Sequence, residues 1–203
     1  MKKLLVLFVA LFGMMNVKAE VKLPDKTDHE VVKMYLVYGN SCGYCHRFIQ
    51  YFVDNYKNEY KDYFEIAALE TWQNNSNANF AEKIRSELGI DRASVPLIVI
   101  GKEYQVGFAT EDGESLIQKA LDAYASDSYS DFVGGMIKKS KETVTVETLK
   151  QAASTAGLST EPAVTPSSKK EKNKELSTPV LIGVLAVVVL GGVAGLVVII
   201  KKQ

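Results

Sequence analysis

The stretch Ser41-Cys42-Gly43-Tyr44-Cys45-His46 contains both cysteines of this 203-residue chain, three positions apart. Because the sequence has no other cysteine, neither a disulfide framework nor a zinc site made of four cysteines can be built. The spacing fits two kinds of chemistry: a C-x-x-C redox pair, or C-x-x-C-H, the attachment pattern for a c-type haem. The residues around the motif decide between these two.

The motif follows a strand pattern and begins a helix pattern. Residues 31–38 are β-branched, aromatic or otherwise apolar except for Lys33 and Tyr hydroxyls, which predicts a mostly buried central strand. Residues 39–41 (Gly-Asn-Ser) predict a turn. From about Cys42 to Tyr60 we expect a helix, because apolar residues recur at helical spacing: Phe48, Ile49, Phe52, Val53, Tyr56 and Tyr60.

The elements that follow predict an α/β domain. Residues 64–69 and 94–102 predict two more strands, and residues 104–108 the hairpin partner of the second one. Helices are expected at about residues 78–88 and 113–124. Strand, helix, strand, helix, hairpin and helix in this order indicate an α/β sandwich with a mixed sheet.

A C-x-x-C pair in the first turn of a helix is suited to thiol chemistry. The first helical N–H groups have no partner within the helix, and the helix N-terminus carries a partial positive charge, so both favour a thiolate. We expect Cys42 to be the exposed nucleophile and Cys45 to resolve its mixed disulfides. Gly43 and Tyr44 would modulate the thiolate. A protonated His46 would also favour it, although this position equally suits an ordinary surface histidine.

The strand, the motif from Cys42 to His46, the aromatic helix and Val95-Pro96 before a hairpin together resemble the thioredoxin-like superfamily. The resemblance covers about residues 21–125, and the motif is similar to that of bacterial Dsb-type thiol–disulfide oxidoreductases and isomerases. It implies a mixed four-stranded sheet flanked by helices and a cis peptide bond before Pro96, which packs against the cysteine pair. It also implies substrate binding at Val95 and Pro96, with no cofactor and no metal.

Two positions depart from thioredoxins proper. Those proteins carry Trp immediately before the first cysteine, where this chain has Ser41, and a buried acid six residues before it, where this chain has Leu36. The acid helps to deprotonate the resolving cysteine, so its absence argues against fast turnover as a cytosolic-type reductant. The sequence leaves open whether the protein oxidises, reduces or isomerises disulfides.

Two alternatives remain beside a redox enzyme. A c-type haem needs a distal ligand and usually a helical protein, and the only candidate ligands outside the N-terminal apolar segment are His29, Met34 and Met136. The other alternative is a substrate-binding or chaperone-like module of thioredoxin-like fold, which would hold partner chains at Val95-Pro96 without needing its thiols.

Both ends of the chain predict export and membrane anchoring. Residues 1–19 combine two lysines, an apolar stretch and small residues before a cleavage position, as signal peptides do. Residues 179–200 are apolar and long enough to span a membrane, which leaves residues 201–203 as a cytoplasmic tail. The thioredoxin-like domain, residues 20–126, would then lie on the extracytoplasmic side of a single-pass type I protein of the cell membrane. The short lysine-containing signal peptide favours a bacterium, with an endoplasmic-reticulum protein as the alternative.

The remaining residues bear on partners. Residues 127–178 predict a flexible linker with one short helix at residues 145–153, because residues 155–178 are rich in Ser, Thr, Pro, Lys and Glu. Expected partners are thiols or disulfides of exported proteins, an unidentified redox partner and the lipid membrane. The 24 basic and 24 acidic residues balance, which argues against nucleic acid. Gly191 and Gly195 form a G-x-x-x-G pattern that can pair transmembrane helices into a homodimer, although glycine is common in such helices.

Overall fold

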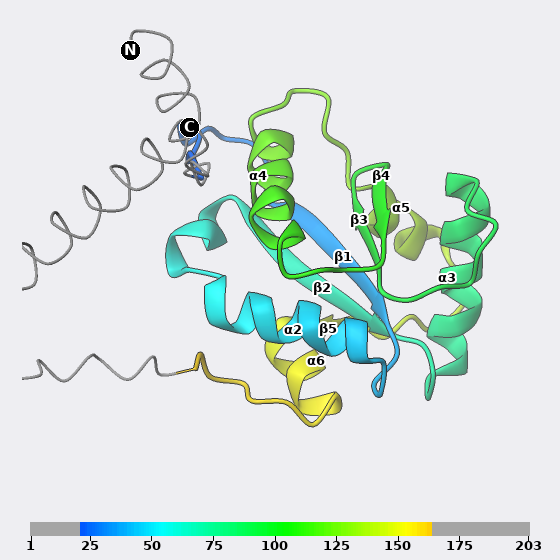
Figure 1. The fold of residues 1–203 in the computed structure, drawn as a ribbon. Coiled ribbons are helices and arrows are strands. Elements are labelled where there is room, and N and C mark those ends of the chain that lie inside the picture. The colour runs from blue at the N-terminus through cyan, green and yellow to red at the C-terminus, as the bar shows by residue number, and fades with distance from the viewer. Residues whose placement is uncertain (1–20, 164–203) are drawn as a thin grey trace, which may run out of the picture. The chain divides into compact units, whose positions relative to one another are not determined.

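The computed structural model describes residues 21–163, which form an α/β domain around a mixed five-stranded sheet (Figure 1). The strand order is β4-β3-β1-β2-β5, in which β1 and β2 are parallel and every other pair is antiparallel. The sheet therefore has one strand more than the expected four. The strands are β1 (Val32–Tyr38), β2 (Phe64–Glu70), β3 (Leu97–Ile100), β4 (Glu103–Val106) and β5 (Glu147–Thr148).

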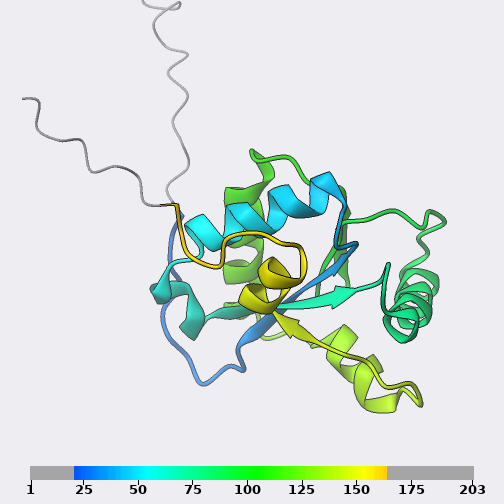
Figure 2. The ribbon, with the colours of Figure 1, turned by 90° about the horizontal axis from the view of Figure 1, so that it is seen from below.

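The central strand β1 is buried on both faces, as its apolar run predicts. Because side chains alternate along a strand, Met34, Leu36 and Tyr38 join one hydrophobic cluster, and Tyr35 and Val37 join another on the opposite face. Helices cover each face and exclude water from both clusters (Figure 2). The first cluster contains both cysteines, so the motif is built on the main core.

Helices α2 (Gly43–Asn55) and α4 (Asp112–Tyr124) lie on the face of the first cluster, and α3 (Asn75–Leu88) and α5 (Phe132–Lys139) lie on the other. Each helix buries residues at helical spacing, for example Cys45, Phe48, Ile49, Phe52 and Val53 of α2. The helices and strands expected up to residue 124 are all present, with boundaries shifted by a few residues.

The helix expected from Cys42 to Tyr60 was predicted too long. It ends at Asn55, and a short 3-10 helix, η1 (Asn58–Asp62), follows after a break at Tyr56. The apolar spacing continues across the break because the rings of Tyr56 and Tyr60 both pack on Phe64, at centroid distances of 5.2 and 5.9 Å. Packing against the start of β2 thus preserves the pattern although the backbone has turned.

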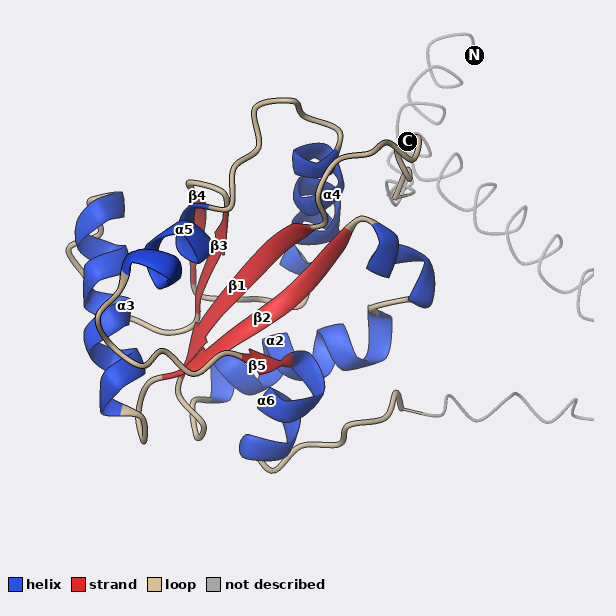
Figure 3. Cartoon of the chain, turned by 180° about the vertical axis from the view of Figure 1, so that it is seen from behind, coloured by secondary structure: helices blue, strands red, loops and turns tan. Residues whose placement is uncertain are grey.

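The flexible linker expected over residues 127–178 is wrong for its first part. Helix α5, strand β5 and a further helix, α6 (Leu149–Thr155), all lie within it, and Figure 3 shows β5 beside β2. β5 pairs with Ala67 and Ala68 of β2, and α6 contributes Leu149, Ala152 and Ala153 to the first cluster. The short helix expected at residues 145–153 is present as α6, with later bounds. Helix α5 and strand β5 are short and bury few side chains, so they leave no strong apolar periodicity in the sequence. Residues 164–178 lie outside the described residues.

The predictions for the two ends of the chain also fall outside the described residues. These are the signal peptide at 1–19, the transmembrane helix at 179–200 with Gly191 and Gly195, and the tail at 201–203. Among residues 21–163, no helix combines the length and the apolar composition needed to cross a membrane.

Candidate functional site

The site begins where β1 ends. After Tyr38 the chain makes a turn, and the N–H of Cys42 donates to the carbonyl oxygen of Gly39 at 3.0 Å. Cys42 keeps an extended backbone (φ −79°, ψ 117°) and is the N-cap of α2, where its sulfur accepts the N–H of Cys45 at 3.4 Å. The nucleophile predicted from the sequence therefore satisfies one of the free N–H groups at the helix N-terminus.

The two thiols are not bonded to each other and differ in burial. Cys45 is fully buried, whereas 8% of the surface of Cys42 is exposed. The expectation of an exposed Cys42 is therefore wrong in degree, because its sulfur turns back toward Cys45 and the loop before β3. Burial raises the pKa of Cys45 well above its ordinary value, and a hydrogen bond with Cys42 raises it further.

The loop before β3 brings a backbone acceptor to the nucleophile. The thiol of Cys42 donates to the carbonyl oxygen of Val95 at 3.7 Å. The Val95–Pro96 peptide bond is cis, as the resemblance implies, and the carbonyl of Pro96 accepts the N–H of Gly107 at 2.8 Å. Val95 packs against both hydrophobic clusters, so its position is fixed by the core on either side of the sheet.

His46 holds the turn before the motif. Its Nε2 lies 2.6 Å from the carbonyl oxygen of Asn40, and because a carbonyl only accepts, Nε2 carries the proton. The backbone N–H of His46 donates to the carbonyl of Cys42 at 2.9 Å. Among the described contacts, the ring of His46 therefore orients the turn and does not bond either sulfur.

Gly43 and Tyr44, between the cysteines, lie on the surface. Space for a Cβ at Gly43 is open, with no atom within 4 Å. Tyr44 is 56% exposed, and the guanidinium carbon of Arg47 lies 4.8 Å from the centroid of its ring. These two residues give the site an open rim.

Glu70 is a site residue that sequence reasoning missed. It is the last residue of β2, and only 5% of its surface is exposed. Its carboxylate accepts hydrogen bonds from four backbone N–H groups. The donors belong to the turn before Cys42 and to the loop after β2: Asn40 at 3.3 Å, Trp72 at 2.8 Å, Gln73 at 2.9 Å and Asn74 at 3.1 Å. An acid at the end of an otherwise apolar strand, before a polar loop, is the signal that could have identified it.

Leu36 lies in β1, six residues before Cys42. Its side chain is fully buried and belongs to the same cluster as Cys42 and Cys45. Burial is accordingly the largest cause of the raised pKa of Cys45.

The candidate haem ligands named from the sequence have contacts of their own in the fold. Met34 is fully buried in β1, and Nδ1 of His29 donates to the carbonyl of Tyr124 at 2.8 Å. Among residues 21–163, no group of three His, Cys, Asp or Glu side chains is placed to hold a metal ion.

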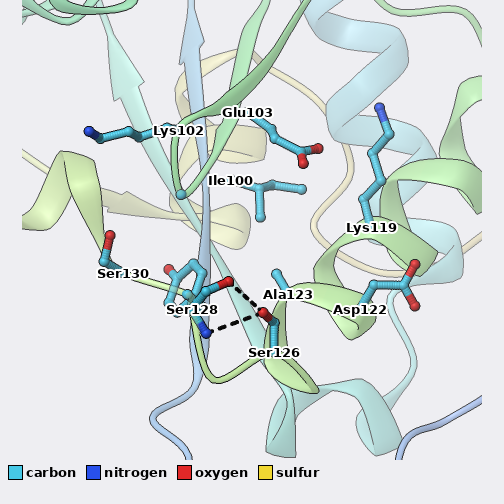
Figure 4. A pocket seen from close by; sticks show the side chains of 11 residues that line it. Ile100, Lys102, Glu103, Lys119, Asp122, Ala123, Ser126, Ser128 and Ser130 are labelled. Carbon is cyan, nitrogen blue, oxygen red and sulfur yellow. Dashed lines mark hydrogen bonds between the residues drawn. The ribbon is translucent and has the colours of Figure 1, made fainter.

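A pocket of the described residues lies away from the thiols. It has a volume of about 410 Å³ and is lined by both bases and acids, among them Lys102, Glu103, Lys119 and Asp122 (Figure 4). It opens beside Ile100, where β3 ends, whereas Pro96 precedes the start of β3. Because Val37 pairs with Leu97 and Met34 with Ile100, this pocket and Cys42 are at opposite ends of β1. The candidate site is therefore a surface around Cys42 and not this pocket.

No protein-family model, no curated protein and no solved structure matches the chain. What the site can do follows from its own geometry: two thiols one helical turn apart, one of them facing a backbone carbonyl.

Proposed function

We propose that the protein is a membrane-anchored, extracytoplasmic thiol–disulfide oxidoreductase with a thioredoxin-like fold. The observation that carries the proposal is the position of Cys42, whose sulfur accepts the Cys45 N–H and lies against the Val95 carbonyl. Exchange requires a nucleophilic sulfur, a second sulfur within reach and a surface that aligns the substrate, and these contacts support assigning the three roles to Cys42, Cys45 and Val95.

The reaction begins at Cys42. Its thiolate attacks one sulfur of a substrate disulfide, so a Cys42–substrate bond forms, the substrate S–S bond breaks, and a substrate thiolate leaves. The Cys45 thiol passes its proton, through water, to the first substrate thiolate, and the resulting Cys45 thiolate attacks the Cys42 sulfur and releases the second substrate thiolate. The Cys42–Cys45 pair is then oxidised and the substrate reduced by two electrons. In the opposite direction the oxidised pair accepts two electrons from a substrate dithiol.

The contacts of the two sulfurs divide these roles. The Cys45 N–H stabilises negative charge on the Cys42 sulfur, both as a nucleophile and as a leaving group. Cys45 is buried and its pKa is raised, so it is a thiol in the free reduced protein at neutral pH. The Val95 carbonyl, which accepts the Cys42 thiol in the free protein, would accept an N–H of an extended substrate segment.

The thioredoxin-like fold is supported by the arrangement of elements. Parallel β1 and β2 are joined through α2, and antiparallel β3 and β4 follow a cis proline. The location is supported by the sequence alone: the signal-peptide pattern at 1–19 and the apolar segment at 179–200 would place this domain outside the membrane. Substrates would be cysteines of exported proteins, together with a redox partner of the same thiol chemistry.

Substitution of each cysteine tests the function. With the full-length chain and a disulfide-containing protein such as insulin, we expect Cys42→Ser to abolish exchange. Cys45→Ser should accumulate a mixed disulfide on Cys42 that a small thiol releases. Tyr104→Ala, which changes an exposed residue of β4, is the control that should leave exchange unchanged. If Cys42→Ser exchanged disulfides at the wild-type rate, the proposed enzyme activity would be disproved. Wild-type client binding by a Cys42→Ser/Cys45→Ser double variant that lacks exchange would instead support a binding module.

A further inference from the structure

Trp72, the only tryptophan of the chain, lies against the turn that leads to Cys42. A Cβ placed on Gly39 would be 2.3 Å from both Cδ2 and Cε2 of the indole, so the ring occupies the space that any larger residue would need. The carbonyl of Gly39 accepts the N–H of Cys42 at 3.0 Å. The indole is therefore in contact with the residue that positions the nucleophile.

The backbone around Trp72 is held from two sides. Its N–H donates to Glu70 at 2.8 Å, and the same carboxylate accepts the N–H of Asn40 in the turn. The preceding Thr71 donates its N–H and its hydroxyl to the carbonyl of Tyr38, each at 2.9 Å. These bonds join the loop after β2 to the turn after β1, so the indole has a fixed place beside the motif.

Despite this fixed backbone, 54% of Trp72 is exposed. Tyr44 and Trp72 are the two most exposed large hydrophobic residues in the described part of the chain. Tyr44 lies between the cysteines, and the ring of Trp72 packs against Gly39 in the turn before them. Gly43 leaves open space beside Tyr44. Fixed aromatic side chains that remain exposed are typical of binding surfaces, because they offer a large apolar area at little entropic cost.

We infer that Trp72 is a specificity-determining residue of the thiol site and selects cysteines that lie beside a large apolar or aromatic side chain. The inference rests on the proposed function and names its substrate class. The occupant is an extended client segment whose cysteine reaches Cys42. The indole contacts Gly39, whose carbonyl accepts the Cys42 N–H, so a segment that exchanges at the sulfur would bring a neighbouring side chain onto the indole.

Two peptide disulfides test this. Each carries one cysteine joined to thionitrobenzoate, flanked by Phe and Leu in the apolar peptide and by glycines in the other. Attack by Cys42 of the full-length chain on the peptide sulfur releases one thionitrobenzoate thiolate, which is coloured. We expect the apolar peptide to react about tenfold faster. Trp72→Ala should remove this preference, Trp72→Phe should retain part of it, and Tyr104→Ala should leave it intact.

Gly39→Ala provides an independent variant, because the added methyl group displaces the indole without removing it. It should reduce the preference as Trp72→Ala does. Gly135→Ala, where a Cβ meets no atom within 4 Å, is its matched control. Because Trp72 is the only tryptophan, its fluorescence is a second readout. In Cys45→Ser, the mixed disulfide with the apolar peptide should change the emission and that with the glycine peptide should not.

The small disulfide of Ellman's reagent separates the two proposals. Exchange with it needs no peptide contact, so the reaction of the wild-type protein with it reports on the thiols alone. If the wild type shows no preference, or if Trp72→Phe, Trp72→Ala and Gly39→Ala all keep it, the inference is wrong while the proposed function stands. If the wild type exchanges with neither Ellman's reagent nor a peptide, the proposed function fails and the inference fails with it.

Discussion

The sulfur of Cys42 lies 3.7 Å from the carbonyl oxygen of Val95, although 53 positions separate the two residues in the sequence. They meet because β3 is antiparallel to β1, with Leu97 opposite Val37, so the end of β1 and the start of β3 share one edge of the sheet. The register of this strand pair thus brings a backbone acceptor to the N-terminus of α2.

The two cysteines should differ sharply in their reaction with alkylating agents. Cys45 is fully buried and its pKa is raised, whereas Cys42 keeps 8% of its surface exposed. We expect brief iodoacetamide treatment of the reduced, folded protein at pH 8 to modify Cys42 alone, and treatment in denaturant to modify both. Peptide mass spectrometry locates the label. Preferential labelling of Cys45 in the folded protein would contradict this assignment of roles.

The buried Cys45 should make the reduced protein less stable at alkaline pH. Its pKa is higher in the folded chain than in the unfolded chain, where a thiol has a pKa of about 8.5. Below that pH both states keep the proton and the full stability is present. Above it only the unfolded state loses the proton, so the free energy of unfolding falls by about 1.4 kcal/mol between pH 7 and pH 9.5.

Urea unfolding of the reduced protein across this range measures the effect, with Cys45→Ala as the comparison. The difference in the free energy of unfolding between the two proteins should shrink by that amount as the pH rises. If this difference in the free energy of unfolding stayed constant with pH, Cys45 would have the same pKa in the folded and unfolded chains. The buried tyrosines with raised pKa, such as Tyr38, would contribute only near and above pH 10.

Glu70 should be far more important for stability than another glutamate of the same strand. Glu70→Ala leaves four N–H groups around the site without their acceptor, and we expect a loss of about 2–3 kcal/mol in the free energy of unfolding. Glu65→Ala removes only an exposed ion pair with Lys33 and should cost less than about 0.5 kcal/mol. Chemical denaturation of both variants decides, and equal losses would show that the Glu70 bonds contribute little.

The segment after Ser126 should be part of the folded domain. A chain that ends at Ser126 loses β5 and uncovers the core surface against which Leu149 and Ala152 pack. We expect its Tm to be lower by about 10 °C or more than that of a chain ending at Pro162, where the compact unit ends. Thermal unfolding followed by circular dichroism compares the two. A chain ending at Ser126 with an unchanged Tm would show that the segment is an independent appendage.

The elements with a strong apolar pattern could be predicted from the sequence. The apolar run before the motif predicted β1, and the spacing of Phe48, Ile49 and Phe52 predicted α2. Prediction failed where the elements are short and bury few side chains, as with α5, which buries only Val133 and Gly134. Glu70 was missed because a carboxylate that binds backbone N–H groups carries no sequence pattern of its own.

The sequence by itself determined the local chemistry of this protein: two thiols one helical turn apart, with Cys42 at the start of the helix that follows β1. Only the tertiary structure decided what surrounds them. The Val95 carbonyl reaches Cys42 through the pairing of β1 with β3, and Trp72 reaches Gly39 through the parallel pairing of β1 with β2. The physical reason is that helix capping depends on neighbours within one turn, whereas strand register depends on how the whole core packs.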